Sequence, residues 1–306
     1  HKLWFYTDDR QPDFAMFMNK EVELLKDRDV RIGIQHSLNV DKVIQTLIRG
    51  DYVRANVSNE GYGEMTNRKV RARPYDLKKA DEHFAKAGFS ERGPDGIRTD
   101  KKGRRLSLRV SYGSPSQTER LVLLKEEAKK AGLELTLQIL DQTAAFKNTH
   151  EKRHEIAYMV WGIREKPDYW GQWHTANSRK TQTNNVTNTA DPELDKLIDA
   201  YRVETDEKKE AEFSRRIQQM IHDDAAHVPL YSVPFFRVAY WRWMKFPTPP
   251  GTKTSDNPAH YFIRDGVLWD GLHWIDEDAR KETDEAMKSG KVFPQVVKID
   301  TTYKAK

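Results

Sequence analysis

Two histidines one helical turn apart are the residues of this chain whose spacing could hold a metal ion. The run His150-Glu151-Lys152-Arg153-His154 matches the pattern H-E-x-x-H, in which both imidazoles bind zinc and the glutamate activates water. That chemistry requires a helix with one face buried in the site. Lys152 and Arg153 are charged, however, no apolar stripe flanks the motif, and a strand is predicted from Ile156 onward. The sequence therefore favours a polar helix-to-strand connector without a metal, with a zinc metallopeptidase as the alternative.

A second group of candidate residues follows the strand predicted at 156–161. The segment Trp161-Gly162-Ile163-Arg164-Glu165 leaves the C-terminal end of that strand, and open α/β sheets bind ligands outside the carboxyl ends of their strands. We therefore expect these five residues to line a ligand site. The alternative is that Trp161 packs into the core and that Arg164 is a solvated cation on a loop.

The elements that would position these residues are typical of an α/β fold. Strands are predicted at 106–112, 133–140 and 156–161, and helices at 117–131, 191–202 and 206–225. These predictions rest on apolar residues that recur every second residue in strands and every three to four residues in helices. A strand, a helix and a strand of this length imply a right-handed crossover that joins a parallel pair.

Two short helices are predicted within residues 27–50. Asp29 can cap the first, in which apolar residues recur four apart and share one face. Asn39 can cap the second, whose apolar stripe ends at Gly50. By itself this pattern predicts only a buried helix pair.

Composition narrows the class of protein. A chain of 306 residues, 37% of them hydrophobic, exceeds one compact domain, so two lobes are expected. The absence of cysteine excludes a disulfide framework, a cysteine zinc site and a cysteine nucleophile. The sequence contains no stretch of 18 apolar residues, the length at which a membrane-spanning helix would be predicted.

The net charge of +5 raises the question of a nucleic-acid partner. The basic cluster Lys101-Lys102-Gly103-Arg104-Arg105 lies between two predicted strands, which makes it a hairpin turn with solvated charges. The sequence has 52 basic and 47 acidic residues, so the positive charge is largely balanced. The basic clusters also lack the interleaved aromatic residues on which nucleic-acid bases stack. We therefore expect a charged, solvated surface and no nucleic-acid partner.

Four segments, in order, resemble one known family. Residues 27–50 read DRDVRIGIQHSLNVDKVIQTLIRG, residues 74–89 contain PYDLKKA and FAKAGF, residues 184–198 contain NN and DPELDKLI, and residues 227–231 read HVPLY. Together they resemble the signatures of family 5 extracellular solute-binding proteins, the peptide and nickel receptors of ABC importers. Departures are small: Gly33 and Ser37 stand where alanine is usual.

The resemblance implies a fold, a domain division and a function. It implies a periplasmic-binding-protein-like type II lobe with a mixed sheet and flanking helices, over residues 21–235. Residues 1–20 would end a first-lobe segment, and residues 236–306 would form a tail that returns to that lobe, so we expect a C-terminal fragment. The implied protein is a monomer without a cofactor or enzymatic activity, in the periplasm or attached outside the membrane. It would capture peptides and deliver them to an ABC transporter permease; a nickel chelate or a sugar are alternative ligands.

The resemblance also implies which residues touch the ligand. In peptide-binding members the loop that matches 161–165 lends backbone groups to an extended ligand, and an aspartate after the tryptophan holds the peptide's amino group. Here Ile163 and Arg164 stand in that neighbourhood and Glu165 is the nearest acid. This departure indicates blocked, modified or acidic peptides, as in the microcin C receptor-like branch. Asn184 and Asn185 are expected to contribute to the same site.

Overall fold

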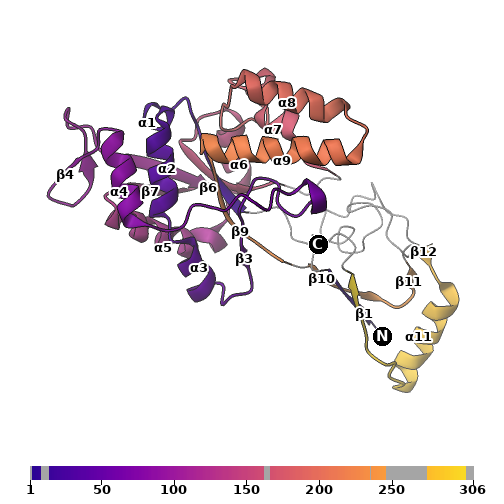
Figure 1. Ribbon diagram of the computed structural model, residues 1–306. Helices are drawn as coiled ribbons and strands as arrows, with labels where there is room; N and C mark the ends of the chain where they lie inside the picture. Colours follow the sequence, from indigo (N-terminus) through magenta and orange to yellow (C-terminus); the bar gives the residue numbers. More distant parts are fainter. Residues whose placement is uncertain (1, 8–13, 162–165, 235, 246–273, 301–306) are drawn as a thin grey trace.

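A six-stranded sheet forms the centre of the larger part of the molecule (Figure 1). The computed structural model describes residues 2–7, 14–161, 166–234, 236–245 and 274–300. The strand order of this sheet is β3-β9-β2-β8-β6-β7. Its strands are β2 (Phe14–Met18), β3 (Val53–Arg54), β6 (Ser107–Tyr112), β7 (Glu134–Ile139), β8 (Ile156–Val160) and β9 (His227–Ser232).

The sheet is mixed in direction. Strand β6 pairs in parallel with both β7 and β8, which confirms the parallel pair predicted for residues 106–112 and 133–140. Strand β2 is antiparallel to both of its neighbours, β8 and β9. Strand β9 therefore runs in the same direction as β8, and its C-terminus lies at the same edge of the sheet.

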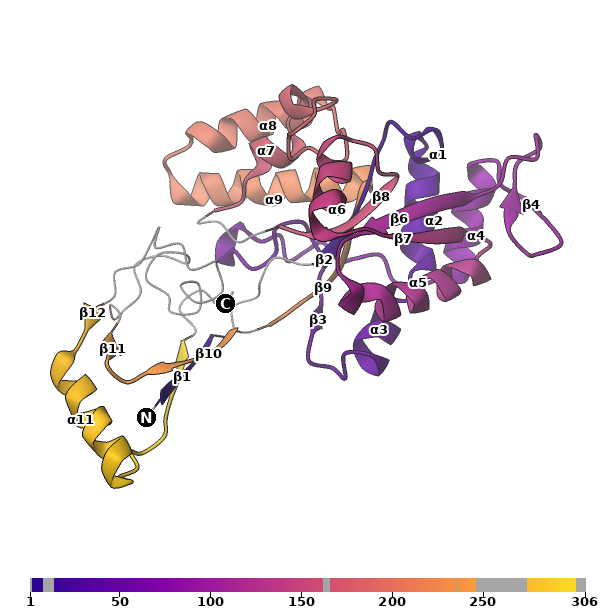
Figure 2. The same ribbon diagram turned by 180° about the vertical axis from the view of Figure 1, so that it is seen from behind.

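Helices cover both faces of the sheet (Figure 2). One face packs against α2 (Arg28–Ser37), α3 (Val40–Thr46), α4 (Leu77–Lys86) and α5 (Thr118–Lys130). The other packs against α7 (Tyr169–Trp173), α8 (Pro192–Val203) and α9 (Glu207–Asp224). In β2, Met16 and Met18 enter the first core, whereas Ala15 and Phe17 enter the second. Because side chains alternate along a strand, two covered faces explain why β2 is apolar throughout.

The helix pair at residues 27–50 forms largely as predicted. The side chain of Asn39 caps α3 by accepting a hydrogen bond from the Lys42 amide. The cap of α2 is Asp27, which accepts from the amide of Asp29, so the cap predicted at Asp29 is wrong by two residues. The Asp29 carboxylate instead lies 2.5 Å from Nδ1 of His83 on α4, and thus joins two helices.

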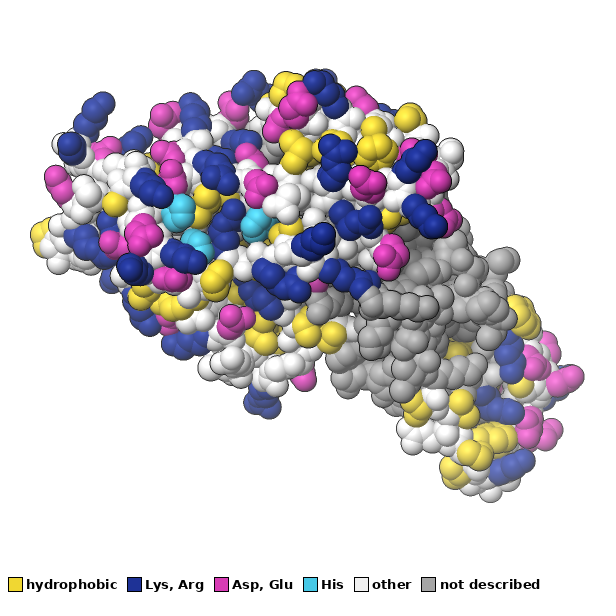
Figure 3. All heavy atoms as spheres, in the orientation of Figure 1, with side chains coloured by type: hydrophobic (Ala, Val, Ile, Leu, Met, Phe, Trp, Pro, Cys, Tyr) yellow, Lys and Arg dark blue, Asp and Glu magenta, His cyan; other side chains and the backbone are white. Residues whose placement is uncertain are grey.

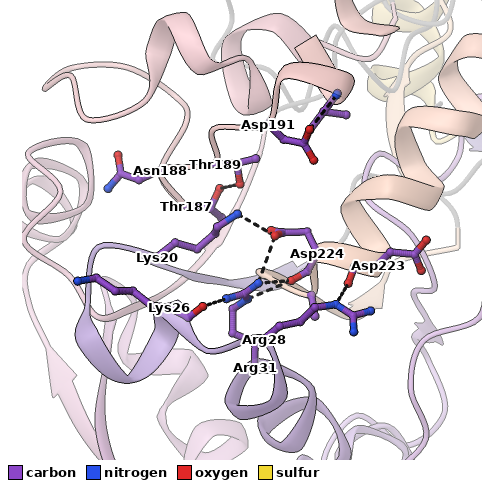
Figure 4. Close-up of polar contacts among 12 residues, drawn as sticks. Lys20, Lys26, Arg28, Arg31, Thr187, Asn188, Thr189, Asp191, Asp223 and Asp224 are labelled. Carbon is purple, nitrogen blue, oxygen red and sulfur yellow. Dashed lines mark hydrogen bonds and ion pairs between the residues drawn. The ribbon is translucent and has the colours of Figure 1, made fainter. Parts of the chain in front are cut away.

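A charged cluster joins the segment after β2 and helix α2 to the end of α9 (Figure 4). Asp224 accepts from Lys20 Nζ at 2.7 Å and from Arg31 at 3.2 Å. The Arg31 guanidinium is buried and also donates to the carbonyl oxygens of Leu25, Lys26 and Asp224. This single side chain therefore satisfies carbonyl groups at the C-termini of both α1 (Glu23–Lys26) and α9.

The basic hairpin predicted near residue 101 is present. Thr99, at the end of β5 (Arg98–Thr99), forms an antiparallel bridge with Arg105, and Asp100 closes the turn between them by accepting from the amides of Lys102 and Arg104. A separate pairing joins β5 to β4 (Glu91–Arg92). Over the face drawn in Figure 3, Lys and Arg side chains lie among Asp and Glu side chains. Within the described residues, no helix is both long and apolar enough to cross a membrane.

Segments from both ends of the chain form a smaller part (Figure 1). Strand β1 (Lys2–Thr7) lies between β10 (Phe236–Trp241), which is antiparallel to it, and β13 (Val296–Asp300), which is parallel. Strands β11 (Met244–Lys245) and β12 (Trp274–Ile275) pair beside α11 (Glu277–Ser289). Trp274 is 54% exposed, and Trp269 lies outside the described residues.

The domain boundary expected after residue 20 needs correction. Strand β2 (Phe14–Met18) pairs with β8 and β9 inside the large sheet, so the chain passes from the smaller to the larger part between Thr7 and Phe14. The prediction failed because β2 has no polar alternation that marks it as a strand. The assignment of β1 and of residues 236–306 to another lobe stays a prediction.

Candidate functional site

The site expected from the sequence lies at one edge of the large sheet, which we call the carboxyl edge. Four strands end there and two begin, and the terminal residues are Tyr112, Ile139, Val160 and Ser232 at the ends and Phe14 and Val53 at the starts. The chain leaves β9 at this edge to enter β10 in the smaller part (Figure 2). An edge at which several strands stop exposes side chains and backbone from different segments to one volume.

Trp161 follows the last residue of β8 and is partly buried. Its ring lies 6.1 Å from the ring of Phe17 and 6.1 Å from that of His150, edge-on to both. Its indole Nε1 is buried and has no hydrogen-bond partner among the described residues. The ring therefore packs on the second core, as the alternative reading of the sequence allowed, while a buried donor at the edge stays available to a further group.

Three large apolar side chains at this edge are about half exposed. Ile139 ends β7, Val160 ends β8, and Phe146 lies on α6 (Gln142–His150); their exposed fractions are 48%, 44% and 56%. The Phe146 ring stacks on His150 at 3.8 Å, and His150 in turn contacts Trp161. Large apolar side chains that stay half exposed at one edge are candidates for contact with another molecule or segment.

The other predicted site residues fall into two groups. Gly162, Ile163, Arg164 and Glu165 lie outside the described residues, so their roles stay predictions. Asn184 lies next to the His150 ring that contacts Phe146 and Trp161, because its Oδ1 is 3.3 Å from Nε2 of His150.

Asn185 instead organises its own loop. Its buried amide nitrogen donates to the carbonyl oxygens of His174 and Thr189, and its oxygen accepts from the Thr189 amide and the Thr187 hydroxyl. Every hydrogen-bonding group of that side chain has a partner, so direct contact with a ligand is not supported by this geometry. Lys152 holds the same loop by donating to the carbonyl oxygens of Thr183 and Asn185, and burial lowers its pKa to about 8.

The H-E-x-x-H run does not form a helix. Helix α6 ends at His150, and Lys152 has a φ of +59°, in the left-handed region. The two histidines therefore do not lie one helical turn apart, as a zinc site of this type requires. Among the residues that the structure describes, no group of three or more His, Cys, Asp or Glu side chains could hold a metal ion.

Both histidines are buried, which the prediction of a polar connector missed. The His154 ring is held near the backbone of Val186, yet neither nitrogen makes a hydrogen bond of normal geometry. Burial, and next the charge of Lys152, lower the pKa of His154 to about 4. This ring is therefore a neutral core residue at physiological pH.

An aromatic cluster around Arg120 also lies at the carboxyl edge, and no local pattern in the sequence predicts it. The hydroxyl group of Tyr158 donates to Gln117 Oε1 at 2.7 Å and lies 2.8 Å from the Tyr231 hydroxyl. The Arg120 guanidinium lies over the rings of Tyr52 and Tyr231, 5.4 and 5.6 Å from their centroids. These residues come from α5, β8, β9 and the segment before β3, so only the fold brings them together.

Comparison with known proteins agrees with this architecture. The family model for bacterial extracellular solute-binding proteins, family 5 Middle, matches residues 2–183. The oligopeptide-binding protein AppA of Bacillus subtilis is 26% identical over 221 residues, which are 70% of this chain and 40% of AppA.

Solved structures share the fold. The structure of Bacillus subtilis AppA in complex with a nonapeptide gives a TM-score of 0.73 at 20% identity, over 90% of this chain and 52% of AppA. NikZ of Campylobacter jejuni in complex with Ni(L-His) gives 0.66 at 18% identity, over 77% of this chain and 48% of NikZ. The chain thus spans about half the length of the relatives it matches. Its fold is that of type II periplasmic binding proteins, and it belongs to the bacterial extracellular solute-binding proteins of family 5.

Proposed function

We propose that this chain forms part of the substrate-binding component of an ABC importer. In this proposal it captures peptides outside the cytoplasmic membrane, in the periplasm or attached to the outer face of the membrane, and delivers them to a membrane permease. It acts as a monomer and performs no chemistry of its own. The smaller part, with β1 and residues 236–306, belongs to the other lobe of the complete binding protein.

One observation supports the location of the ligand. Ile139 and Val160 end two strands at the carboxyl edge with half-exposed side chains, and the half-exposed Phe146 is linked to Trp161 through His150. Apolar side chains of a peptide would cover them, and its backbone would pair with the chain that follows β8, as an added strand does. The relative AppA is named for binding oligopeptides and was solved with a nonapeptide, which favours this class of ligand.

A nickel chelate is the second candidate, because NikZ was solved with Ni(L-His). Proteins that share a fold bind different ligands, so the class of ligand has to be argued from the residues of the site. Half-exposed apolar side chains at the carboxyl edge suit peptide side chains better than a charged chelate, which favours the peptide.

Mass spectrometry of the molecules that co-purify with the complete binding protein, of which this chain is proposed to form part, tests the proposal. We expect peptides to be released on denaturation and to rebind in calorimetry. Release of nickel with histidine, or retention of no peptide from a random-sequence pool, would contradict it.

Arg164 is proposed to face an anionic group of the peptide. A charge-assisted hydrogen bond of this kind contributes about 1.5 to 3 kcal/mol, so Arg164→Ala is expected to weaken binding roughly tenfold to a hundredfold, at about 1.4 kcal/mol per decade. Calorimetry with a confirmed peptide measures this. Unchanged affinity with a normally folded variant would make Arg164 a surface charge only, and a preference for free over blocked amino termini would contradict the proposed polarity.

A further inference from the structure

We propose that a basic surface beside the C-terminal half of α9 binds the anionic headgroups of a lipid membrane. This basic surface consists of Arg28, Arg68, Lys69, Arg71, Arg73 and Arg215. In the middle of the face drawn in Figure 3, Lys and Arg side chains lie side by side. The inference goes beyond the proposed function, because it concerns another class of ligand and does not depend on peptide binding.

Three segments that are distant in the sequence bring these cations together. Arg73 and Arg28 donate to two successive carbonyl oxygens in the last turn of α9, at 3.1 and 2.5 Å. Further back along α9, Arg215 donates to the carbonyl oxygen of Glu64 at 2.6 Å, shortly before the basic segment 68–73 begins. The basic surface therefore follows one side of α9 from Arg215 to the end of the helix.

The positive charge of this surface is largely uncompensated. Among the described residues, Arg68 is the member of the basic surface that forms an ion pair, with Glu64 at 3.7 Å. The acidic side chains at the end of α9 have other partners, because Asp223 accepts from Gln219 and Asp224 belongs to the charged cluster described above. Unpaired cations on one side of the molecule attract an anionic partner.

The basic hairpin near residue 101 differs from the basic surface in this respect. There Arg104 pairs with Asp100 at 3.2 Å, and Arg105 pairs with Asp95 at 2.8 Å. Carboxylates of the hairpin region thus neutralise part of its charge. A run of basic residues in the sequence does not by itself make a positive surface, whereas the fold leaves one along α9.

The basic segment 68–73 is also held in place at both ends. The Asn67 amide donates to the buried Gln218 Oε1 at 2.6 Å, and Arg73 is anchored to the end of α9. Between them, Val70 is buried and only 4% exposed, while the cationic side chains on either side of it are exposed. Cations on a fixed backbone lose less conformational freedom on binding than cations on a mobile loop.

The composition of the basic surface favours a lipid headgroup over a protein partner. No large apolar side chain of residues 60–76 or of α9 is exposed, although protein–protein interfaces usually have an apolar core. An anionic membrane attracts basic segments by charge alone. Most cations of the surface are arginines, whose guanidinium groups pair with phosphate oxygens through two parallel hydrogen bonds.

Co-sedimentation of the chain with lipid vesicles tests the proposal. One set of vesicles contains phosphatidylcholine with phosphatidylglycerol, and the other contains phosphatidylcholine alone. We expect binding to the vesicles that contain phosphatidylglycerol only, and we expect it to weaken as salt is added, because ions screen exposed charges. Failure to bind the anionic vesicles, or equal binding to both sets, would overturn the proposal.

Two variants of equal net charge separate the basic surface from the overall charge of the chain. A cation near an anionic membrane strengthens binding roughly fivefold, so the combined change Arg68→Gln, Lys69→Gln and Arg71→Gln should weaken vesicle binding roughly hundredfold. The matched control is Lys101→Gln, Lys102→Gln and Arg104→Gln in the basic hairpin, which should change vesicle binding by less than about threefold. Equal losses in the two variants would show that only net charge matters, and the basic surface would not be the site.

Soluble polyglutamate distinguishes a lipid from an acidic protein as the partner. We expect the anionic vesicles to retain the chain when polyglutamate is added at the same concentration of negative charge. Displacement by polyglutamate would assign the basic surface to an acidic protein and overturn the lipid proposal. The vesicles contain no peptide, so either result leaves the proposed peptide-binding function untouched.

A measurement on the wild-type protein covers the case in which the variant of the basic surface does not fold. An amine-reactive reagent modifies exposed lysines, and peptide mapping reports the modification of each. Vesicles with phosphatidylglycerol should slow the modification of Lys69, and phosphatidylcholine vesicles should not. Lys101 should react equally in both. Unchanged modification of Lys69, or equal slowing of Lys69 and Lys101, would overturn the proposal.

Discussion

The hydroxyl oxygens of Tyr158 and Tyr231 lie 2.8 Å apart and connect β8 to β9, two strands that β2 separates. The ring of Phe14, at the start of β2, lies 6.0 Å from the first tyrosine ring and 5.5 Å from the second. Side chains from three successive strands thus close one face of the sheet at its carboxyl edge. Burial raises the pKa of both tyrosines, so both hydroxyl groups stay protonated and hydrogen-bonded.

Removal of one hydroxyl group should therefore destabilise the large sheet. Tyr158→Phe removes the hydrogen bond to Gln117 and the contact between the two tyrosine hydroxyls, while Arg120 still donates to Gln117; we expect a cost of about 0.5 to 1.5 kcal/mol in unfolding free energy. The double variant Tyr158→Phe with Tyr231→Phe should cost less than the sum of the two single changes, because the hydroxyls share one contact. Urea unfolding measures all three proteins, and strict additivity would show that the pair is not coupled.

Substitution of Arg31 should lower the unfolding free energy more than substitution of an exposed arginine. Arg31→Met removes the donor for three carbonyl oxygens and for Asp224, and we expect a loss of about 3 kcal/mol in unfolding free energy. Arg28→Gln is the control, because Arg28 is exposed and, within the described residues, its side chain donates one hydrogen bond, to the Asp223 carbonyl oxygen. Its change should stay within about 0.5 kcal/mol. Similar losses in both variants would mean that Arg31 acts through general surface charge.

Glu127 should make stability fall in acid. Burial acts to raise the pKa of Glu127, but hydrogen bonds from Lys130, Lys42 and Tyr75 outweigh it and lower the pKa from 4.5 to about 2. The carboxylate therefore stabilises the fold fully above pH 4.5, and this contribution is lost as the pH falls towards 2. Glu127→Gln should lower the unfolding free energy by about 1 to 3 kcal/mol at pH 7.

The difference between wild type and Glu127→Gln should shrink steadily below pH 4.5. Chemical unfolding at several pH values measures this difference. A difference that does not change with pH would show that the variant loses packing rather than charge.

His154 should make the unfolding free energy depend on pH at milder acidity as well. Its pKa falls from 6.5 to about 4 because of burial and next because of Lys152, so the unfolded chain binds a proton that the folded chain excludes. Stability is therefore complete above pH 6.5 and declines as the pH falls towards 4, by at most about 1.4 kcal/mol per pH unit. His222, whose pKa burial and Arg73 also lower to about 4, acts in the same direction.

The variant His154→Leu tests this assignment, because leucine fills much of the buried space without titrating. Its unfolding free energy should change less between pH 7 and pH 5 than that of the wild type. Equal pH slopes for both proteins would assign the dependence to other groups.

The protein should bind no zinc at the H-E-x-x-H run. Helix α6 ends at its first residue, and His154 is separated from it by the left-handed turn at Lys152. After dialysis, elemental analysis should find less than about one zinc ion per ten chains, and a chelator should not change the melting temperature. Stoichiometric zinc after dialysis would restore the metallopeptidase alternative.

Local sequence patterns predict many of the helices and strands in the larger part of the molecule. The segment from β6 to β8 shows alternating strands, a helix with one apolar face and glycine stops, which predict its elements to within a few residues. Strand β2 was missed because both of its faces are buried, which removes the alternation on which strand prediction depends. The burial of His154 was missed because burial is decided by distant segments.

The candidate site was predictable only in part. The end of β8 follows from its apolar run and from the rule that ligands lie at carboxyl ends of strands. The cluster of Arg120, Tyr52, Tyr158 and Tyr231 joins four distant segments, and no local spacing signals such a contact. Asn185 was assigned to the ligand from its sequence position, whereas its buried hydrogen bonds are a property of the folded loop.

The pairing of β1 with β10 and β13 sets the order in which the two sheets can be completed as the chain emerges from the ribosome. All six strands of the large sheet have been synthesised once Ser232 is added, whereas the three-stranded sheet must wait for residues 296–300. Among the described strands, its first strand therefore has no partner until β10 is made. Because unpaired strands invite association with other chains, this interval leaves the edges of β1 open to such association.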